Sequence, residues 1–483
     1  MTAPPVKRTE ELRSDFAHLI DGELVSGEKW LEVINPATGA VFARCPEAGR
    51  EELDRAVAAA KEAFAAWKGT SYEERAALLK KMAAALEQNQ DGMGELLTRE
   101  QGKPLAQSVA EIGRGSGQLL GLSSIEIPVE IIADDDQKRV ELHYRPLGVT
   151  GIITPWNAPI NLALGPIASA LYTGNTIVLK PSPYTPLTTL KMGELMKDIF
   201  PKGVVNVLAG GDELGQWMCE HPDIAKISFT GSVETGKKVM AGAAGTLKRI
   251  TLELGGNDAA IVLDDVDPKT VAKKLFFAAT VNCGQVCMAV KRIYAHEKIY
   301  DALCAALAEE ARAAKLGSGL EPDTVLGPIQ NRMQYEKLIG LLEDTRKSGA
   351  EILAGGEVPQ DPGYFIPPTV VTGLKEDSRL VREEQFGPLI PVLKFTDLDD
   401  ALRRANDSVF GLCGSVWTTD LKKGADIAAR LEVGTAWVNQ HRATAPTIPF
   451  GGAKQSGLGR QYSIIGLKGY MEPLVISIAK QGL

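Results

Sequence analysis

The chain has 483 residues, which is long for one hydrophobic core, so we expect two or more domains. Hydrophobic residues make up 44% and charged residues 24%, a balance typical of a globular protein rather than of a disordered or fibrous one. The formal net charge is −8 and no Lys/Arg-rich block occurs, which argues against a nucleic-acid partner because such a partner needs a concentrated basic face.

The sequence also argues against a membrane association. No run of about 18 apolar residues occurs, and the opening stretch MTAPPVKRTEELRSDF lacks the apolar core of a secretory signal. We therefore expect a cytoplasmic location.

Cysteine and histidine usage indicates reduced thiols and no metal site. No HExxH motif or paired CxxC motif occurs among these residues. The cysteines are too sparse for a disulfide scaffold: Cys45, Cys219, Cys283, Cys287, Cys304 and Cys413.

Along the chain, the first clear element is a helix. Between Glu51 and Trp67 apolar residues recur at spacings of three or four, which predicts an amphipathic helix that covers a core.

From Gly148 to Gly256, short β-rich runs then alternate with helical stretches. The predicted strands are 148–154, 175–180, 204–208, 226–230 and 249–254; the predicted helices include Pro159 to Tyr172, Pro186 to Phe200 and one that begins near Ser232. This alternation predicts a parallel sheet with helices on both faces.

Gly- and Pro-rich turns follow these predicted strands: TPWNAP, KPSP, AGG, TGS and ELGG. They lie at the carboxyl ends of the strands, where open α/β sheets bind their ligands. One such turn is weak support, because turns need glycine anyway, whereas five at corresponding positions favour a nucleotide site.

A second series of elements begins after Gly256. It comprises DAAIVL, a helix that carries VNCGQVC, VKRIYA, a helix to Leu316, GTAWVN and finally IPFGGAKQSGLGR. We interpret this series as a second α/β domain, with Gly255 and Gly256 as the link.

The stretch VNCGQVC raises the question of a nucleophile. A catalytic thiol needs a lowered pKa, an electrophile beside it and donors for the oxyanion. The spacing alone favours buried core cysteines over a nucleophile, and as i, i+4 neighbours on a helix Cys283 and Cys287 could also form a redox or metal pair.

The motifs around this stretch resemble the aldehyde dehydrogenase superfamily. They are PWN at 155–157, FTGS at 229–232, LELGG at 252–256, GQVC at 284–287, EEQFGP at 383–388 and PFGGAKQSGLGR at 449–460. They span nearly the whole chain in the family's order, and the combination of ELGG with GQxC is the most specific of them.

The resemblance implies three catalytic roles. Cys287 matches the nucleophile that forms a thiohemiacetal and then a thioester, which leaves Cys283 as a bystander. Asn157 matches the amide that donates to the oxyanion together with the backbone N–H of Cys287, although an Asn here can also cap the following helix. Glu253 matches the general base, with a pKa raised by burial; a salt-bridged surface Glu is the alternative.

The resemblance also implies an NAD site, with NADP left open. Lys180 matches the lysine on the adenosine ribose, Gly231 and Ser232 open a helix toward the pyrophosphate, and Glu384 and Phe386 match residues on the nicotinamide ribose and ring. The other predicted cofactor contacts are Ile153, Thr154, Pro155, Trp156, Ser182, Pro183, Gly211, Gly215, Phe229, Thr230 and Leu254.

Three departures from the family pattern concern specificity. Pro183 stands where many NAD-preferring members carry a glutamate, so the cofactor preference is open. Gln461 replaces a frequent glutamate, which weakens a second-base role. Arg442, beside His441 in the entrance segment NQHRATAPT, is a candidate anchor for a substrate carboxylate, or else a solvated loop arginine.

The resemblance predicts a Rossmann-type cofactor domain, an α/β catalytic domain and a small β oligomerisation arm. The expected boundaries are 1–123 and 147–254 for the cofactor domain, 255–461 for the catalytic domain, and 124–146 with 462–483 for the arm. The arm predicts a homodimer or homotetramer, in which its C-terminal strand extends a neighbour's sheet.

The predicted function is oxidation of a small-molecule aldehyde to the carboxylic acid with NAD(P)+ and water, with no nucleic-acid or membrane partner. One alternative is a CoA-acylating semialdehyde dehydrogenase, whose relatives generally lack the base at the Glu253 position. A non-catalytic member of the fold is a second alternative. A Cys–His hydrolase is disfavoured because no histidine falls in a motif that frames Cys287.

Overall fold

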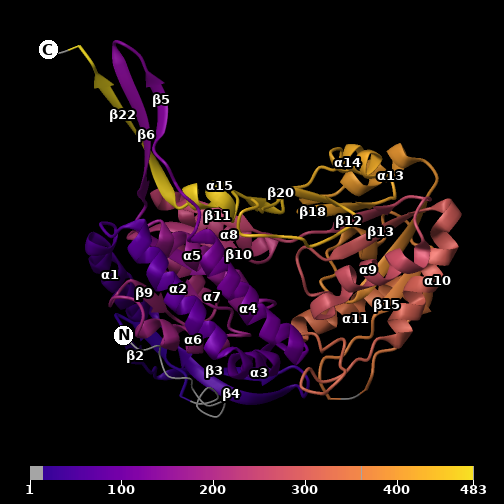
Figure 1. The fold of residues 1–483 in the computed structure, drawn as a ribbon. Helices are drawn as coiled ribbons and strands as arrows, with labels where there is room; N and C mark the ends of the chain where they lie inside the picture. Colours follow the sequence, from indigo (N-terminus) through magenta and orange to yellow (C-terminus); the bar gives the residue numbers. More distant parts are fainter. Residues whose placement is uncertain (1–14, 361, 482–483) are drawn as a thin grey trace.

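The computed structural model describes residues 15–360 and 362–481, which form two α/β bodies and a projecting arm (Figure 1). The opening stretch and the predicted domain ends at residues 1 and 483 lie outside the described residues. The α/β fold class predicted from the sequence is confirmed. No helix in the described ranges is long and apolar enough to cross a membrane.

The first body is built on a mostly parallel sheet. Within the described ranges it has eight strands, in the order β2 (Glu23–Val25), β1 (His18–Ile20), β9 (Val205–Val207), β8 (Thr176–Lys180), β7 (Val149–Ile153), β10 (Ile224–Thr230), β11 (Arg249–Glu253) and β21 (Gly457–Leu458). The five predicted strands are the parallel centre of this sheet. Their carboxyl ends therefore meet at one edge, as the motifs predicted.

The described part of the first body contains eight α-helices, and the four that the sequence positioned, at 51–67, 159–172, 186–200 and near Ser232, lie close to those positions. The eight are α1 (Arg50–Trp67), α2 (Tyr72–Gln88), α3 (Gln90–Gln101), α4 (Leu105–Leu122), α5 (Pro159–Tyr172), α6 (Leu187–Lys197), α7 (Asp212–Glu220) and α8 (Val233–Ala243), which a short 3₁₀ turn (Ala244–Thr246) follows. Local signals explain two of the starts. Pro159 occupies the first turn of α5, and the Ser232 hydroxyl caps α8 by accepting from the backbone N of Thr235.

The second body contains a seven-stranded sheet within the described residues. Its order is β14 (Glu351–Ala354), β15 (Thr369–Thr372), β16 (Leu389–Phe395), β13 (Val290–His296), β12 (Asp258–Val262), β18 (Cys413–Trp417) and β19 (Thr435–Val438). Its helices are α9 (Pro268–Thr280), α10 (Glu297–Ala313), α11 (Arg332–Lys347), α12 (Arg379–Arg382), α13 (Leu398–Asn406) and α14 (Leu421–Ala428). Apolar side chains fill the space between sheet and helices, among them Ile293, Leu303 and Val392.

The predicted helix through VNCGQVC is wrong. The α-helix α9 ends at Thr280, and a 3₁₀ turn, η3 (Val281–Gly284), precedes an irregular segment that carries Cys287. Asn282 and Cys283 both adopt left-handed backbone angles, with φ of 52° and 55°, which ends the helical path. The two cysteines therefore do not share a helix face.

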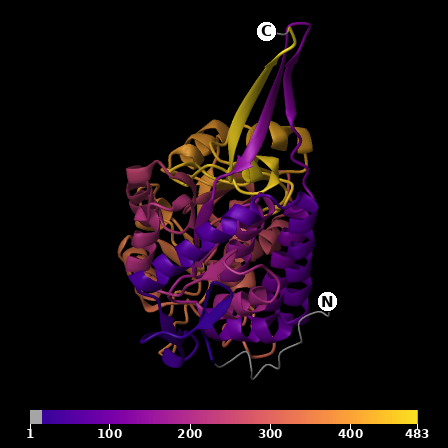
Figure 2. The same ribbon diagram turned by 90° about the vertical axis from the view of Figure 1, so that its left-hand side faces the viewer.

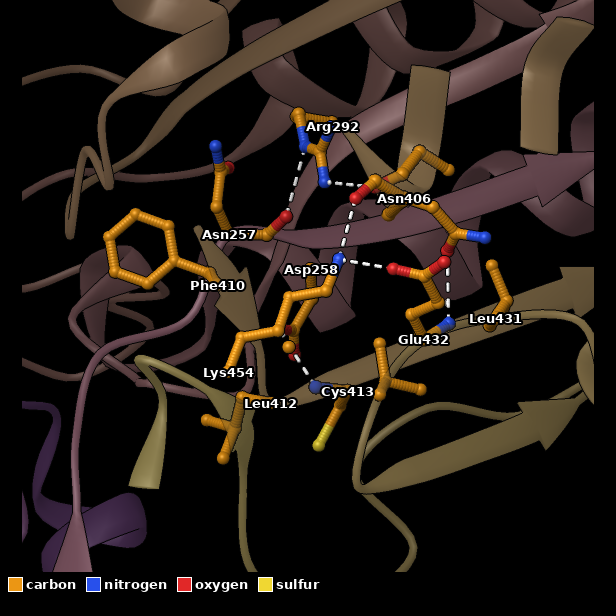
Figure 3. Close-up of a pocket in the computed structure, with 15 residues that line it drawn as sticks. Asn257, Asp258, Arg292, Asn406, Phe410, Leu412, Cys413, Leu431, Glu432 and Lys454 are labelled. Carbon is orange, nitrogen blue, oxygen red and sulfur yellow. Dashed lines mark hydrogen bonds and ion pairs between the residues drawn. The ribbon is translucent and has the colours of Figure 1, made fainter. Parts of the chain in front are cut away.

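The start of β12, which follows the link from β11, is anchored within the second body. Figure 3 shows Arg292, whose Nε donates to the carbonyl of Asn257 at 2.9 Å, and the backbone N of Cys413, which donates to Oδ1 of Asp258 at 3.1 Å. The hollow between these residues has a volume of about 10 Å³, enough for one water at most. This hollow is too small to be a substrate site.

The arm consists of β22 (Met471–Ala479), β6 (Lys138–Pro146) and β5 (Glu130–Asp134), which extend away from both bodies (Figure 2). Helix α15 (Ser463–Lys468) leads into it, and β21 returns to the first sheet by pairing with β11. Two small ribbons complete the described fold, β3 (Lys29–Asn35) with β4 (Ala40–Glu47) and β17 (Phe410–Gly411) with β20 (Ala453–Lys454). The predicted domain boundaries stay predictions.

Candidate active site

A cavity of about 360 Å³ contains the sulfur-bearing residue that the motifs single out. We call it the Cys287 cavity. Its lining comes from α4, the start of α5, residues 281–288 and residues 442–446, and it includes Asn157, Arg114 and Arg442. Elements of both bodies thus surround one space.

The two cysteines of VNCGQVC have different surroundings. Cys283 is only 1% exposed and belongs to the apolar core of the second body, whereas Cys287 is partly exposed and lines the cavity. Only Cys287 is placed to meet a ligand. A lowered thiol pKa was required of a nucleophile, and the structure shows the opposite: burial raises the pKa of Cys287 to about 12, although the nearby Lys291 ammonium lowers it.

The segment before Cys287 is held by its own polar side chains. Gln285 donates from Nε2 to the carbonyl of Asn282 at 3.0 Å and accepts at Oε1 from the backbone N of Gln330 at 2.8 Å. Gly284 has a φ of +73°, and a Cβ there would lie 2.3 Å from the carbonyl O of Gly387, so only glycine fits. These contacts fix the backbone that presents Cys287.

Asn157 is buried at the start of α5 and faces this segment. Its Nδ2 donates to the carbonyl of Gln285 at 2.9 Å. It does not cap α5, whose cap residue is Ala158. A side-chain amide has two N–H donors, so one remains for a ligand in the cavity.

A buried ion pair of Lys103 and Glu111 contacts the backbone of Asn157 and the start of α5. Lys103 Nζ bonds Oε2 of Glu111 and donates at 2.8 Å to the carbonyl of Asn157. Oε1 of Glu111 accepts from the backbone N–H groups of Ile160 and Asn161, at 3.1 and 3.2 Å. Glu111 therefore satisfies the orphan donors at the start of α5, the role that the sequence had left open for Asn157.

Glu253 ends β11 and is 5% exposed. Neither carboxyl oxygen has a hydrogen-bond partner among the described residues. Burial raises the pKa of Glu253 well above its usual value, and the positive charge of Arg460 opposes this shift. Glu253 is therefore no surface ion-pair residue, and its charge is felt at Cys287, whose thiol pKa it raises.

The predicted cofactor residues gather along the carboxyl ends of β7, β8 and β10. We call residues 153–156, 180–183 and 229–232 the strand-end rim. Burial lowers the pKa of Lys180 to about 8, while the charges of Asp212 and Glu47 raise it. The Lys180 ammonium has only a long contact, 3.4 Å, to the carbonyl of Pro181, and the buried hydroxyl of Thr154 has no partner among the described residues.

The other predicted cofactor residues lie on the strand-end rim or next to it. Ser182 is buried and Pro183 half-buried after β8, and the Phe229 ring lies directly against Gly231. Gly211 caps α7, and Gly215 on that helix faces the Lys180 side chain. Ile153, Pro155 and Thr230 complete the ends of β7 and β10, and Leu254 directly follows β11.

Glu384 and Phe386 come from the second body and face the same region. Glu384 Oε1 accepts from the backbone N of Gly256 at 2.9 Å and lies 3.5 Å from Lys291 Nζ. A Cβ at Gly255 would lie 2.3 Å from Glu384 Oε2, which explains the glycine. The ring of Phe386 meets that of Trp156 edge to face, with centroids 5.3 Å apart, so a contact between the bodies forms here.

Several residues of the site carried no usable signal in the sequence. Lys103 and Glu111 lie 54 and 46 residues before Asn157, outside every Gly-rich strand end. Lys291 Nζ donates to the carbonyls of Val286, at 3.0 Å, and Cys287, and thus holds the backbone at Cys287. His441 bonds the carbonyl of Met288 at 3.1 Å. Such roles depend on long-range contacts, which no local pattern reveals.

Comparisons with known proteins agree with this geometry. The family model described as "Aldehyde dehydrogenase family" matches residues 24–476. The chain is 40% identical to a putative aldehyde dehydrogenase, FUS7, of Gibberella fujikuroi, over 95% of this chain and 97% of that protein. It is 38% identical to betaine aldehyde dehydrogenase of Bacillus subtilis, over 94% and 95%.

Solved structures give the same result. A variant of the aldehyde dehydrogenase from Bacillus cereus has a TM-score of 0.96 and 36% identity, with 99% of this chain and 100% of that chain covered. Betaine aldehyde dehydrogenase of Staphylococcus aureus in complex with NAD+ has a TM-score of 0.95 and 33% identity, with 98% and 97% covered. The chain belongs to the aldehyde dehydrogenase family, so it is an oxidoreductase and the resemblance seen in the motifs is confirmed.

Proposed function

We propose that this protein oxidises an aldehyde to the carboxylic acid with NAD(P)+ and water, through a thiohemiacetal and a thioester on Cys287. The observation that carries the proposal is the convergence of three groups. Cys287 and Asn157 line one cavity, and the charge of Glu253, whose carboxyl has no hydrogen-bond partner among the described residues, raises the pKa of the Cys287 thiol.

In the first step, Cys287 Sγ bonds to the aldehyde carbon and the carbonyl oxygen becomes an oxyanion. The free N–H of the Asn157 amide donates to this oxyanion, whose charge develops only during the reaction. Since burial raises the thiol pKa, Cys287 is protonated in the free protein, and its proton passes to water in the cavity as the sulfur bonds to the aldehyde carbon.

The strand-end rim fits a dinucleotide. The Lys180 ammonium and the Thr154 hydroxyl are buried with weak or missing protein partners, and the α8 N-terminus begins at Ser232. When bound, NAD(P)+ supplies the hydride acceptor. The rim would hold the adenosine and pyrophosphate, while Glu384 and Phe386 would hold the nicotinamide ribose and ring. NAD is the proposed principal cofactor, since its complex is known for a structural relative.

Glu253 then supports release of the acid. A water molecule that attacks the thioester must lose a proton, and Glu253 is the group that accepts it. A base with a raised pKa holds a transferred proton better than an ordinary carboxylate does. The presence of this base favours hydrolysis over transfer of the acyl group to CoA.

The arm supports assembly into a homodimer or homotetramer. β22 and β5 are the edges of its sheet, and Ile132, Val475 and Ile478 on them are exposed. Pairing with a second copy would cover these edges. The six cysteines are free, which supports a cytoplasmic location.

The decisive experiment is stopped-flow kinetics on Glu253→Gln. We expect one fast burst of reduced cofactor and a steady phase about 10²-fold or more slower than that of the wild type, because only deacylation needs the base. The wild-type steady rate should rise with pH through the raised pKa of Glu253, since the carboxyl is ionised only above it. Unchanged acid release, or product released only when CoA is added to the wild type, would contradict the proposal.

A further inference from the structure

Two arginines of the Cys287 cavity have no acidic partner. Arg114 projects from α4, and Arg442 lies in the loop that follows β19. No ion pair joins either guanidinium to a carboxylate among the described residues, although most arginines on this protein's surface have one. These two cations thus face the cavity uncompensated.

Arg442 is held in place without being neutralised. Its Nε is buried and has no hydrogen-bond partner in the described parts of the chain, and its guanidinium lies over the Phe277 ring at 5.9 Å. The backbone at Arg442 is left-handed, with a φ of 67°, a conformation that costs energy for a side chain of this size. The loop therefore directs a cation toward the cavity instead of letting it reach solvent.

The other charges of the cavity do not neutralise Arg114 and Arg442. Burial lowers the pKa of Arg442 to about 10, Arg114 lowers it and Cys287 raises it, so Arg442 is still a cation at neutral pH and senses both neighbours. Glu111 is the one carboxylate among the described lining residues, and both of its oxygens are occupied by Lys103 and the start of α5. Two positive charges therefore remain.

We propose that the substrate is an aldehyde with a carboxylate at its far end, which Arg114 and Arg442 bind while the aldehyde carbon reaches Cys287. A guanidinium offers a planar pair of donors that match a carboxylate, and a buried cation without a partner favours an anionic ligand. Arg114 is exposed to solvent at the edge of the cavity, whereas a neutral aldehyde would leave the buried Nε of Arg442 without a partner. The proposal rests on the proposed function, because it names the substrate class of the same site.

The test compares two substrates of nearly equal shape, succinic semialdehyde and its uncharged methyl ester, with glutaric semialdehyde as a longer acid. The kcat/KM of each is measured by NADH absorbance for the wild type, Arg442→Gln, Arg114→Gln and the double variant. Arg55→Gln is the matched control, since Arg55 is exposed on α1, far from the cavity lining in sequence and fold.

We expect the wild type to prefer at least one acid over the ester. Each cavity variant should lower kcat/KM for the acid about 10- to 100-fold and change that for the ester less than about threefold. Arg55→Gln should change neither. Succinate should inhibit turnover of the ester competitively in the wild type and about tenfold more weakly in Arg442→Gln.

The outcomes separate this inference from the proposed function. A wild type that oxidises the ester and shows no preference for either acid, or variants that leave the acid-to-ester ratio unchanged, would overturn the carboxylate proposal alone. A wild type that oxidises none of these aldehydes would overturn both. If Arg442→Gln loses activity on the ester as well, Arg442→Lys decides: recovery of the acid preference supports the proposal, and its absence refutes it.

Discussion

The strand-end rim and the Cys287 cavity are built differently. The rim follows parallel strands that are neighbours in one sheet, so the backbone alone brings its turns together. The cavity combines α4, η3 and the loop with Arg442, which are far apart in the sequence and meet through side chains.

This difference separates two properties of the enzyme. Backbone ends that converge in a sheet suit a large ligand that is common to many enzymes, because they present N–H groups and small residues at fixed positions. A cavity made of side chains can be altered one residue at a time without change to the sheet. We therefore expect cofactor choice to depend on the rim and aldehyde choice on the cavity, with Cys287 common to both.

The largest expected effect is on kcat, and it tests the role of Cys287. Cys287→Ser should lower kcat by about 10³-fold or more with every aldehyde and either cofactor, because a hydroxyl is a poor nucleophile without a dedicated base. Steady-state NADH formation measures this. Cys283→Ser is the matched change four residues away, and it should keep most of the activity of the folded enzyme.

The control substitution Cys283→Ser should itself destabilise the folded protein. A hydroxyl placed in the apolar core of the second body should lower the free energy of unfolding by about 1–3 kcal/mol, measured by urea titration. The opposite pattern, with Cys283→Ser inactive while folded and Cys287→Ser active, would show that Cys283 and not Cys287 is the nucleophile.

The second-largest effect concerns the buried ion pair of Lys103 and Glu111 in the wall of the cavity. Lys103→Met leaves the Glu111 carboxylate without its cation, so we expect a loss of about 3–5 kcal/mol in the free energy of unfolding. Because Lys103 also donates to the Asn157 carbonyl, kcat should fall in the molecules that remain folded. Urea titration and kinetics measure the two losses.

A double variant distinguishes the pair from simple loss of packing. Lys103→Met combined with Glu111→Gln removes both charges while it retains an acceptor for the Ile160 N–H, and it should recover part of the lost stability. Strictly additive losses would mean that the two charges do not stabilise each other.

The rim was largely predictable from the sequence, whereas the sequence identified only part of the cavity, namely Cys287, Asn157 and Arg442. The helix from Pro159 to Tyr172 has the predicted bounds, since proline at the start and the flanking strands define it locally. The helix predicted through Cys283 failed because Asn282 bonds the Asn157 carbonyl at 2.8 Å, a contact across 125 residues that holds a left-handed turn. Lys103, Glu111 and Arg114 were missed for the same reason: their roles exist only after α4 packs beside α5.

The smallest expected effect is on cofactor choice at the rim. Pro183 is half-buried directly after Ser182, at the position that the family resemblance places beside the adenosine ribose. A glutamate here would accept hydrogen bonds from the ribose hydroxyls and repel a 2′-phosphate, whereas proline does neither and Lys180 remains able to meet a phosphate. We expect the wild type to turn over NADP beside NAD, and Pro183→Glu to shift the ratio of kcat/KM values toward NAD by roughly tenfold, which corresponds to ~1.4 kcal/mol.

Pro183→Gln is the matched control, because it restores the hydrogen bonds and the backbone N–H without the charge and should shift the ratio less. The KM for the aldehyde should not change in either variant, since the rim and the cavity act separately. A wild type that ignores NADP, or equal shifts with Glu and Gln, would mean that a residue other than the one at 183 sets the preference.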